Sequence, residues 1–141
     1  MISKHTILYA EDDIDDLFMV KKAFEAHDSI EVLHAANGSE ALQILNGLLQ
    51  NNLKPCLVIL DINMPVMNGK ETLLKMKESG EFEEIPVVLF STSSSRIDQD
   101  FAQKWGVELF TKPLSYEHLE AIIRQFVDKC NFEINKLKSK G

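Results

Sequence analysis

The chain has 141 residues and a mass of 16.0 kDa, with 45% hydrophobic residues, 26% charged residues and a formal net charge of −7. This size and composition fit one folded domain with a single core and exclude an intrinsically disordered chain. The acidic balance argues against a nucleic-acid-binding surface, because phosphate contacts need clustered Lys and Arg, and the basic residues here are mostly scattered.

The first third of the sequence alternates between strand and helix patterns. Residues 6–10 read as a strand, and the helical pattern after it has Asp13 or Asp15 available as its N-cap. A second strand is expected at residues 30–35. Asn37 then opens a second amphipathic helix, which ends in a polar stretch.

The middle of the chain contains a short, fully apolar run, residues 56–60, that ends at Asp61. Such a run bounded by turn residues predicts a buried parallel strand. A weaker helical pattern follows and stops near Gly80. The next strand is expected at residues 85–90, with Pro86 at its start, where a missing N–H donor does little harm.

The last third repeats the alternation. Residues Ile97, Phe101 and Trp105 fall at helical spacing, residues 107–110 form a short strand, and residues 119–130 carry a regular helical stripe. Five strand–helix units with short connections predict an α/β fold with a doubly wound, five-stranded parallel sheet, because parallel strands need crossovers and right-handed crossovers place helices on both faces.

Polar side chains gather where these strands end, which is the edge at which open α/β sheets bind ligands. Converging carboxylates repel one another unless a cation neutralises them, and oxygen-only ligands suit Mg²⁺. A lysine and hydroxyl groups opposite them would hold phosphoryl oxygens, so the edge is suited to accept phosphate on Asp61. The groups are Glu11-Asp12-Asp13, Asp61, Ser91-Thr92-Ser93 and Thr111-Lys112-Pro113.

Four motifs in order along the chain resemble the response-regulator receiver domains of two-component signalling, of the single-domain type found in chemotaxis and beside phytochrome kinases. This resemblance implies a flavodoxin-like (βα)5 fold with strand order 2-1-3-4-5. It covers one domain, residues 1–141, with a core at about 5–130 and a helical extension or tail at 131–141. The motifs are Ile7-Leu8-Tyr9-Ala10-Glu11-Asp12-Asp13, Leu60-Asp61-Ile62-Asn63-Met64-Pro65 with Met67 and Gly69, Pro86-Val87-Val88-Leu89-Phe90-Ser91-Thr92, and Phe110-Thr111-Lys112-Pro113.

By position, the resemblance implies that Asp61 accepts a phosphoryl group from a phosphohistidine. Mg²⁺, or Mn²⁺ in its place, would be bound by Asp61, by Asp12 directly, by Glu11 through water and by the main-chain carbonyl of Asn63. The acidic pair could instead be Asp12 with Asp13, but the family's acids follow four apolar strand residues, here 7–10, which favours Glu11.

The resemblance assigns the remaining site residues to the phosphoryl group. Ser91 and Thr92 take the hydroxyl switch position, and Lys112 binds phosphate and precedes Pro113, a candidate cis-proline. Asn63 and Ser93 match positions that tune hydrolysis of the phosphoaspartate.

One position departs from the family. An aromatic residue is often found three residues before the lysine and couples to the hydroxyl switch, but here that position is Leu109. Phe110 follows it and should point to the opposite face of the strand.

A regulatory phosphoacceptor is therefore favoured over an enzyme. An aspartyl-nucleophile phosphatase on the same fold usually has a second acid two residues after the nucleophile, where this chain has Asn63. An unphosphorylated scaffold receiver is the other alternative. The expected partners are a sensor histidine kinase or histidine phosphotransfer protein and a downstream protein target.

The end of the chain suggests a surface for those partners. The apolar stripe of the last helix continues in phase beyond Cys130, so a continuous helix would overhang the sheet and expose Phe132, Ile134 and Leu137. This overhang, with the surface of the fourth helix, fifth strand and fifth helix, is a possible homodimer or partner face.

The two cysteines, Cys56 and Cys130, lie on apolar stretches and are interpreted as buried small hydrophobic residues rather than a disulfide framework. The chain shows no secretory leader pattern and no apolar run of membrane-spanning length. We therefore expect a cytoplasmic protein that does not bind membranes.

Overall fold

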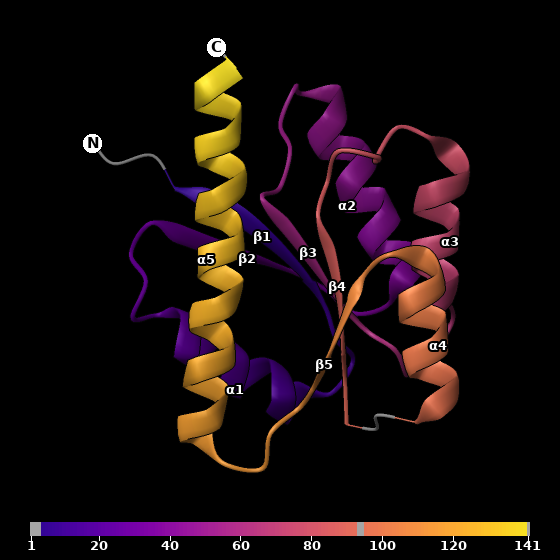
Figure 1. The fold of residues 1–141 in the computed structure, drawn as a ribbon, viewed down its shortest axis with the longest axis vertical. Coiled ribbons are helices and arrows are strands. Elements are labelled where there is room, and N and C mark those ends of the chain that lie inside the picture. Colours follow the sequence, from indigo (N-terminus) through magenta and orange to yellow (C-terminus); the bar gives the residue numbers. More distant parts are fainter. Residues whose placement is uncertain (1–3, 93–94, 141) are drawn as a thin grey trace.

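The computed structural model describes residues 4–92 and 95–140, and within them five parallel strands alternate with five helices (Figure 1). The strands form one sheet in the order β2-β1-β3-β4-β5, as predicted. The strands are β1 (His5–Ala10), β2 (Ile30–Ala35), β3 (Leu57–Asp61), β4 (Val87–Ser91) and β5 (Glu108–Thr111), and the helices are α1 (Ile14–Phe24), α2 (Gly38–Gln50), α3 (Gly69–Ser79), α4 (Arg96–Trp105) and α5 (Tyr116–Lys140).

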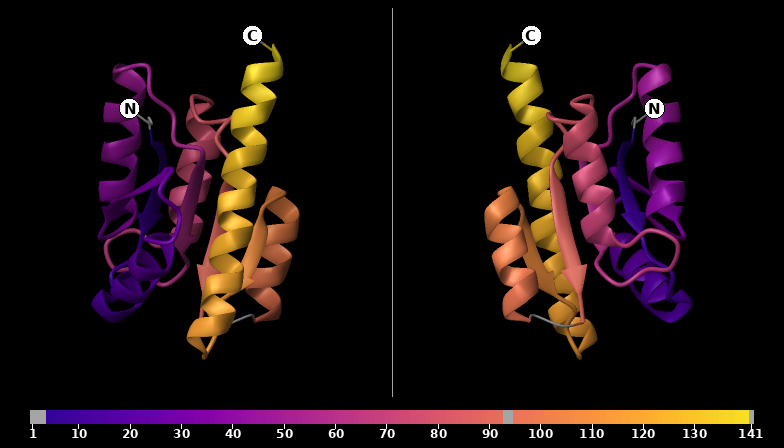
Figure 2. Two further views of the ribbon diagram at one scale, coloured as in Figure 1. Left: turned by 90° about the vertical axis from the view of Figure 1, so that its left-hand side faces the viewer. Right: turned by 90° about the vertical axis from the view of Figure 1, so that its right-hand side faces the viewer.

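Helices cover both faces of the sheet. Helices α1 and α5 lie on one face, and α2, α3 and α4 lie on the other (Figures 1 and 2). Neighbouring residues of a strand point to opposite faces, so Ile7 and Tyr9 belong to the apolar cluster under α1 and α5, while Leu8 belongs to the cluster under the other three helices. All the residues of β3 are buried, as expected of a central strand.

Side-chain caps explain where several helices begin. The Asp13 carboxylate accepts a hydrogen bond from the main-chain N–H of Asp16 at 2.9 Å, so Asp13 rather than Asp15 is the N-cap of α1. Asn37 caps α2 in the same way. Asn68 caps α3 in a capping box with Glu71. The first turns that these caps fix lie beside the strand ends, so they position the loops of the polar edge.

Strand β5 has the side-chain orientations that the sequence predicted. Phe110 is buried against α5, with its ring 4.9 Å from that of Phe126 in an edge-to-face contact. Leu109 is half-buried and packs into the cluster on the α4 side. The position taken by an aromatic switch residue in many receivers therefore contributes ordinary aliphatic packing here.

Helix α5 is continuous for 25 residues and extends past the edge of the sheet (Figure 1). Phe132 is 69% exposed, as predicted. The prediction was wrong for Ile134, which is half-buried and packs against the core cluster on the α1 and α5 side. It lies one helical turn beyond Cys130, on the same face of the helix. The side chain of Leu137 is outside the described residues.

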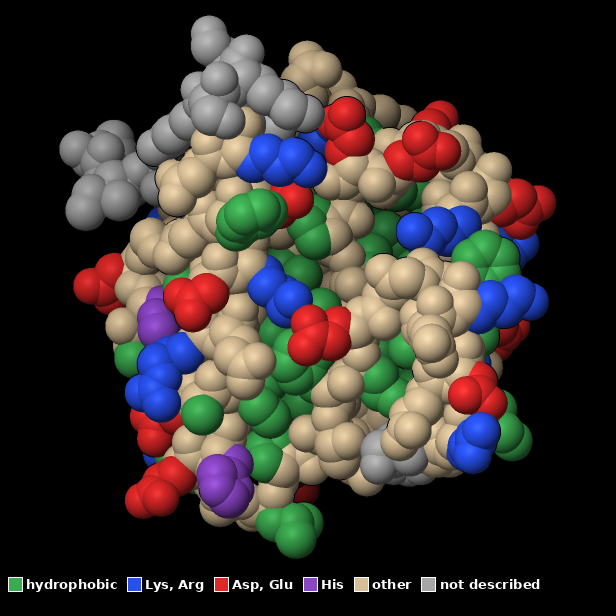
Figure 3. Space-filling view, in the orientation of Figure 1, with side chains coloured by type: hydrophobic (Ala, Val, Ile, Leu, Met, Phe, Trp, Pro, Cys, Tyr) green, Lys and Arg blue, Asp and Glu red, His purple; other side chains and the backbone are tan. Residues whose placement is uncertain are grey.

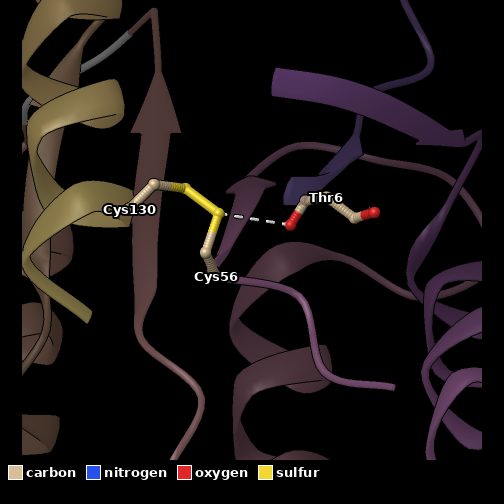
Figure 4. The surroundings of a disulfide bond; sticks show 3 residues. All are labelled: Thr6, Cys56 and Cys130. Carbon is tan, nitrogen blue, oxygen red and sulfur yellow. Dashed lines mark hydrogen bonds between the residues drawn. A yellow bond between two sulfur atoms is a disulfide. The ribbon is translucent and has the colours of Figure 1, made fainter. Parts of the chain in front are cut away.

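The two cysteines form a disulfide, which corrects the prediction of unpaired thiols (Figure 4). Both are buried, with exposed fractions of 8% for Cys56 and 0% for Cys130. Their Cα atoms lie 4.8 Å apart, within the range that a disulfide spans. They are separated by 74 residues, so only the packing of α5 against the start of β3 brings them together, and no local pattern reveals it.

Acidic and basic side chains are interspersed on the face of the molecule shown in Figure 3. Within the part of the chain that the structure describes, no helix combines the length and apolar character that crossing a membrane requires.

Candidate functional site

The strand ends bring the predicted residues to one edge of the sheet. Asp61 is the last residue of β3 and Ser91 the last of β4, while Glu11 and Lys112 directly follow β1 and β5. Because parallel strands end at the same edge, residues up to 101 positions apart in the sequence come into direct contact there.

The loop between β3 and α3 holds Asp61 in place. The N–H of Asn63 donates to Asp61 Oδ1 at 3.2 Å, and the N–H of Gly69 donates to the carbonyl of Ile62 at 3.0 Å. A Cβ atom at Gly69 would lie 2.3 Å from the Asp61 carbonyl oxygen, so only glycine allows α3 to begin this close to the strand.

The same loop contains a strained turn at Val66. This residue has a φ of 67°, and the N–H of Met67 donates to the carbonyl of Pro65 at 2.7 Å, which makes a γ-turn around Val66. A β-branched residue is rarely found in this left-handed region. Val66 is 81% exposed, so no packing contact compensates for the backbone conformation.

Lys112 is the cation at the centre of the site. Its ammonium group contacts Glu11, lies 2.9 Å from Asp16 Oδ2 and lies 3.3 Å from Asp61 Oδ2. The lysine and the carboxylates of Glu11 and Asp61 are nearly enclosed, with side-chain exposed fractions of 9%, 0% and 7%. One buried positive charge thus contacts carboxylates from three separate parts of the fold and offsets part of their repulsion.

Glu11 is held by further groups that the sequence did not identify. The hydroxyl of Tyr9 donates to Glu11 Oε1 at 2.7 Å, and the N–H of Asp13 donates to Oε2 at 3.3 Å. His34 Nε2 lies 2.6 Å from the main-chain oxygen of Glu11. Tyr9 pairs with His34 across β1 and β2, so both side chains are fixed by the sheet register.

These contacts separate the proton affinities of the two buried acids. Burial and the neighbouring Glu11 raise the pKa of Asp61 to about 7, although Lys112 and the Asn63 N–H oppose the change. Burial alone would raise the pKa of Glu11, but its contacts with Asp61, Lys112 and Tyr9 outweigh burial and lower that pKa. When the pair holds a proton, that proton therefore lies on the Asp61 side, and a cation that binds the ionised acid competes with it.

The carboxylates that contact Lys112 also raise the pKa of its ammonium group. Burial alone would lower the pKa of Lys112, but contacts with Glu11, Asp16 and Asp61 raise it above its ordinary value. Tyr9 stays protonated because burial, followed by the charge of Glu11, raises its pKa. Both groups therefore act as hydrogen-bond donors near neutral pH.

A divalent cation fits the acidic part of the site. Glu11, Asp12 and Asp61 each offer one carboxylate oxygen, and these atoms lie within 4.8 Å of one another. Mg²⁺ binds oxygens at about 2.0–2.1 Å, which spaces its ligands roughly 3 to 4 Å apart. Small movements would suffice to bring the oxygens to that spacing. Asp12 is exposed, which leaves room for water ligands.

The hydroxyl groups differ in their accessibility. Ser91 is fully buried at the end of β4, one residue beyond Phe90, which pairs with Asp61 in the sheet, whereas Thr92 is exposed. Ser93 lies outside the described residues. The side chain of Asn63 is exposed beside the acids. Two predictions about Asn63 stay untested: that its main-chain carbonyl binds the metal, and that the residue tunes hydrolysis of the phosphoaspartate.

The comparison with known families decides the class. The family model for the response regulator receiver domain matches residues 7–124, which include every motif described above. The chain belongs to this family.

Curated and solved receivers resemble it closely. The two-component response regulator ARR17 of Arabidopsis thaliana is 35% identical over 127 residues, covering 82% of this chain and 80% of ARR17. The phosphorylated cyanobacterial phytochrome response regulator RcpA superposes with a TM-score of 0.78 at 28% identity, covering 88% of this chain and 91% of RcpA. The Mn²⁺-bound form of the response regulator Rcp1 gives 0.75 at 26% identity, covering 86% and 90%.

Some relatives are much longer than this receiver. The chain spans 33% of a protein-glutamate methylesterase of Methanococcoides burtonii and 9% of a histidine kinase of Formosa agariphila. Similarity to such proteins concerns their receiver part. Receivers are regulatory phosphoacceptor domains, so the shared class does not transfer the esterase or kinase activity.

The peptide bond before Pro113 differs from the prediction for this receiver. Within residues 4–92 and 95–140 no peptide bond is cis, so Lys112–Pro113 is trans and the expected cis-proline is wrong. The trans chain still continues the pairing of β5 with β4, because the N–H of Lys112 donates to the Ser91 carbonyl at 2.7 Å. The ammonium group reaches its carboxylates in this conformation.

Sequence reasoning missed Asp16, Tyr9 and His34. Tyr9 lies two residues before Glu11, so the alternation of the strand could have placed both on one side. His34 could be placed only through the pairing of β1 with β2. Asp16 looked like an acidic residue of a first helical turn, and its contact with Lys112 depends on how far the lysine side chain, which follows β5, reaches across the strand ends toward the start of α1.

Proposed function

We propose that this receiver accepts a phosphoryl group on Asp61 from the phosphohistidine of a sensor histidine kinase or a histidine phosphotransfer protein. The observation that carries the proposal is the placement of Asp61, a 5% exposed carboxylate in contact with Lys112 and close to two further acids. A buried acid in this setting is a nucleophile held in a fixed position.

In the proposed reaction, an ionised carboxylate oxygen of Asp61 attacks the phosphorus atom. The P–N bond of the phosphohistidine breaks, its electron pair returns to the imidazole, and the imidazole takes up a proton. Glu11, Asp12, Asp61 and the Asn63 carbonyl would hold Mg²⁺, or Mn²⁺ in its place, and the ion would supply positive charge that favours the ionised form of Asp61. The Mn²⁺-bound form of Rcp1 supports a divalent ion in this fold.

The product is stabilised by the groups on the other side of Asp61. Lys112 moves from its resting carboxylate partners to a phosphoryl oxygen, and the Ser91 and Thr92 hydroxyls donate to the others. As the family resemblance implies, Asn63 and Ser93 tune the rate at which the acyl phosphate is hydrolysed. The receiver is therefore a phosphoacceptor that assists its own phosphorylation and dephosphorylation.

The signal leaves through protein contacts. The proposed face comprises α4, β5 and α5, where Leu109 packs under α4 and Phe132 is exposed. It meets a downstream target or a second copy of the chain, or the phosphoryl group passes onward in a relay. The proposed location is the cytoplasm, where the catalytic parts of histidine kinases lie.

Incubation with acetyl phosphate and Mg²⁺, read by intact mass, tests this function. We expect the mass to increase by one phosphoryl group, with no increase in EDTA or in Asp61→Asn, and the bond to be labile in base. Absence of labelling with Mg²⁺ present would leave the unphosphorylated scaffold as the better description. Repeated release of phosphate from unrelated phosphomonoesters would instead indicate an aspartyl-nucleophile phosphatase.

A further inference from the structure

The disulfide lies at the edge of the sheet opposite the acidic site. Cys56 immediately precedes β3, the strand that carries Asp61 at its other end, and Cys130 lies in α5 (Figure 4). The bridge therefore attaches the longest helix of the fold to the beginning of its central strand. Nothing in the phosphoacceptor chemistry uses this bond.

Its position divides α5 into two parts. Before Cys130, the helix buries Leu119, Ile123, Phe126 and Val127 against the sheet. After Cys130, the described side chains of residues 131–136 include no buried residue, and only Ile134 packs against the core. The disulfide is thus the last firm attachment of the helix before its overhanging end.

The surroundings also suit the reduced form. Cys56 Sγ lies 3.4 Å from the main-chain oxygen of Thr6, the dashed contact in Figure 4. A disulfide sulfur has no proton to donate, but a Cys56 thiol could donate to this oxygen. Cys130 lies in an apolar cluster, where a thiol behaves as a small hydrophobic side chain. Reduction would therefore place no unpaired charge at either sulfur.

Of the two cysteines, only Cys56 retains exposed surface. It is 8% exposed and lines an open hollow of about 630 Å³ together with Leu48, Leu53 and Ile134, whereas Cys130 is fully buried. An attacking thiolate would therefore approach from the Cys56 side, with Cys130 as the leaving group. Because a thiolate left in an apolar environment is unfavourable, this exchange should be slow but possible in the folded protein.

We propose that Cys56 and Cys130 form a reversible dithiol–disulfide couple that attaches the C-terminal end of α5 to β3 when oxidised and releases it when reduced. The reductant is a dithiol. Its first thiolate attacks Cys56 Sγ and the bridge breaks, so that Cys130 leaves as a thiolate and takes up a proton. Its second thiol then displaces Cys56 as a thiol, so two electrons and two protons pass to the chain. A disulfide such as oxidised glutathione reverses the step.

A cytoplasmic location would favour this role, because disulfides that form in that compartment are usually transient or redox-sensing. To that extent the inference rests on the proposed function. The redox experiment itself uses no phosphodonor, so its failure can be distinguished from a failure of phosphotransfer.

The test is titration of the native chain with dithiothreitol against its oxidised form, followed by alkylation and intact mass. Two alkyl groups should appear together while circular dichroism stays native, and oxidised glutathione should restore the unalkylated mass. In parallel, hydrogen exchange of amides beyond residue 130 should accelerate about tenfold or more in the reduced state, while residues 116–126 stay protected.

The double variant Cys56→Ala, Cys130→Ala is the matched control, and its amides beyond residue 130 should exchange rapidly under both conditions. Three results would each overturn the inference: thiols that react before any reductant is added, a bridge that opens only in denaturant, or equal exchange of the helix end in both states. The measurements on the unaltered chain decide the matter even if the variant does not fold.

Discussion

Replacing Asp61 by Asn should stabilise the fold near neutral pH in the absence of metal, although it removes the nucleophile. An unfolded Asp ionises near pH 3.8, whereas burial and Glu11 raise the pKa of Asp61 in the folded chain to about 7. Each pKa unit corresponds to about 1.4 kcal/mol, so the ionised carboxylate costs the fold up to about 4 kcal/mol. Relaxation of the surrounding groups would reduce the measured gain to about 2–4 kcal/mol.

The sign of the pH dependence follows from the protons that the folded and unfolded chains bind. Between pH 3.8 and about 7 the folded chain keeps a proton on Asp61 that the unfolded chain releases, so the contribution of Asp61 to stability falls as the pH rises through this window. Below the window the acid is neutral in both states, and above it the cost is constant. Since the asparagine side chain of the variant does not titrate, the difference between the two proteins should grow across the same window.

Urea unfolding in EDTA at several pH values between 4 and 8 measures this difference. The variant and the original chain should have equal m values, similar midpoints at the acid end and clearly different midpoints at the alkaline end. Mg²⁺ should reduce the difference, because it stabilises only the chain with the acidic ligand. Asp12→Asn serves as the control, since that exposed carboxylate should give a much smaller gain. A difference that does not vary with pH, or a variant less stable at pH 8, would refute the reasoning.

Three further predictions concern the neighbouring residues. Lys112→Ala should destabilise the metal-free chain by about 3–5 kcal/mol, because Glu11 and Asp61 lose their buried counter-charge. It should also abolish the spectroscopic response to beryllofluoride without abolishing Mg²⁺ binding, and an undiminished response would contradict the assigned role. Asp16→Asn, which removes a half-exposed partner worth about 1 kcal/mol or less, should speed phosphorylation by acetyl phosphate up to about fivefold; a slower rate would mean that Asp16 helps the reaction. Val66→Asn should raise the free energy of unfolding by about 1 kcal/mol, seen as a higher melting temperature, because Asn tolerates the positive φ; a lower one would show that the valine contributes packing.

Local patterns were sufficient for the strands, the helices and the central site residues. Strand ends at one edge of a parallel sheet must converge, so Glu11, Asp61 and Lys112 could be brought together without coordinates. The alternation along β5 likewise predicted the opposite orientations of Leu109 and Phe110, which the packing confirms.

Apart from the trans Lys112–Pro113 bond and the local Tyr9–Glu11 contact, the failures involve contacts between segments that are distant in the sequence. The Cys56–Cys130 bridge depends on where α5 lies along the sheet, and the exposure of Ile134 depends on the same placement. Asp16 contacts Lys112 because the lysine side chain reaches from the end of β5 across the strand ends to the first turn of α1. The periodicity of a helix gives the direction of a side chain around the helix axis, but not the distance to the element that it meets.

The burial of β3 has a consequence for how different states of this protein should be compared. The strand pairs with β1 on one side and β4 on the other, and every residue from Leu57 to Asp61 is buried. A phosphoryl group on Asp61 is therefore attached to a part of the molecule that is held on all sides, whereas Lys112 reaches it from the separate segment that follows β5. Conformations should accordingly be superposed on β1, β3 and β4, so that displacements elsewhere are measured from the point of modification.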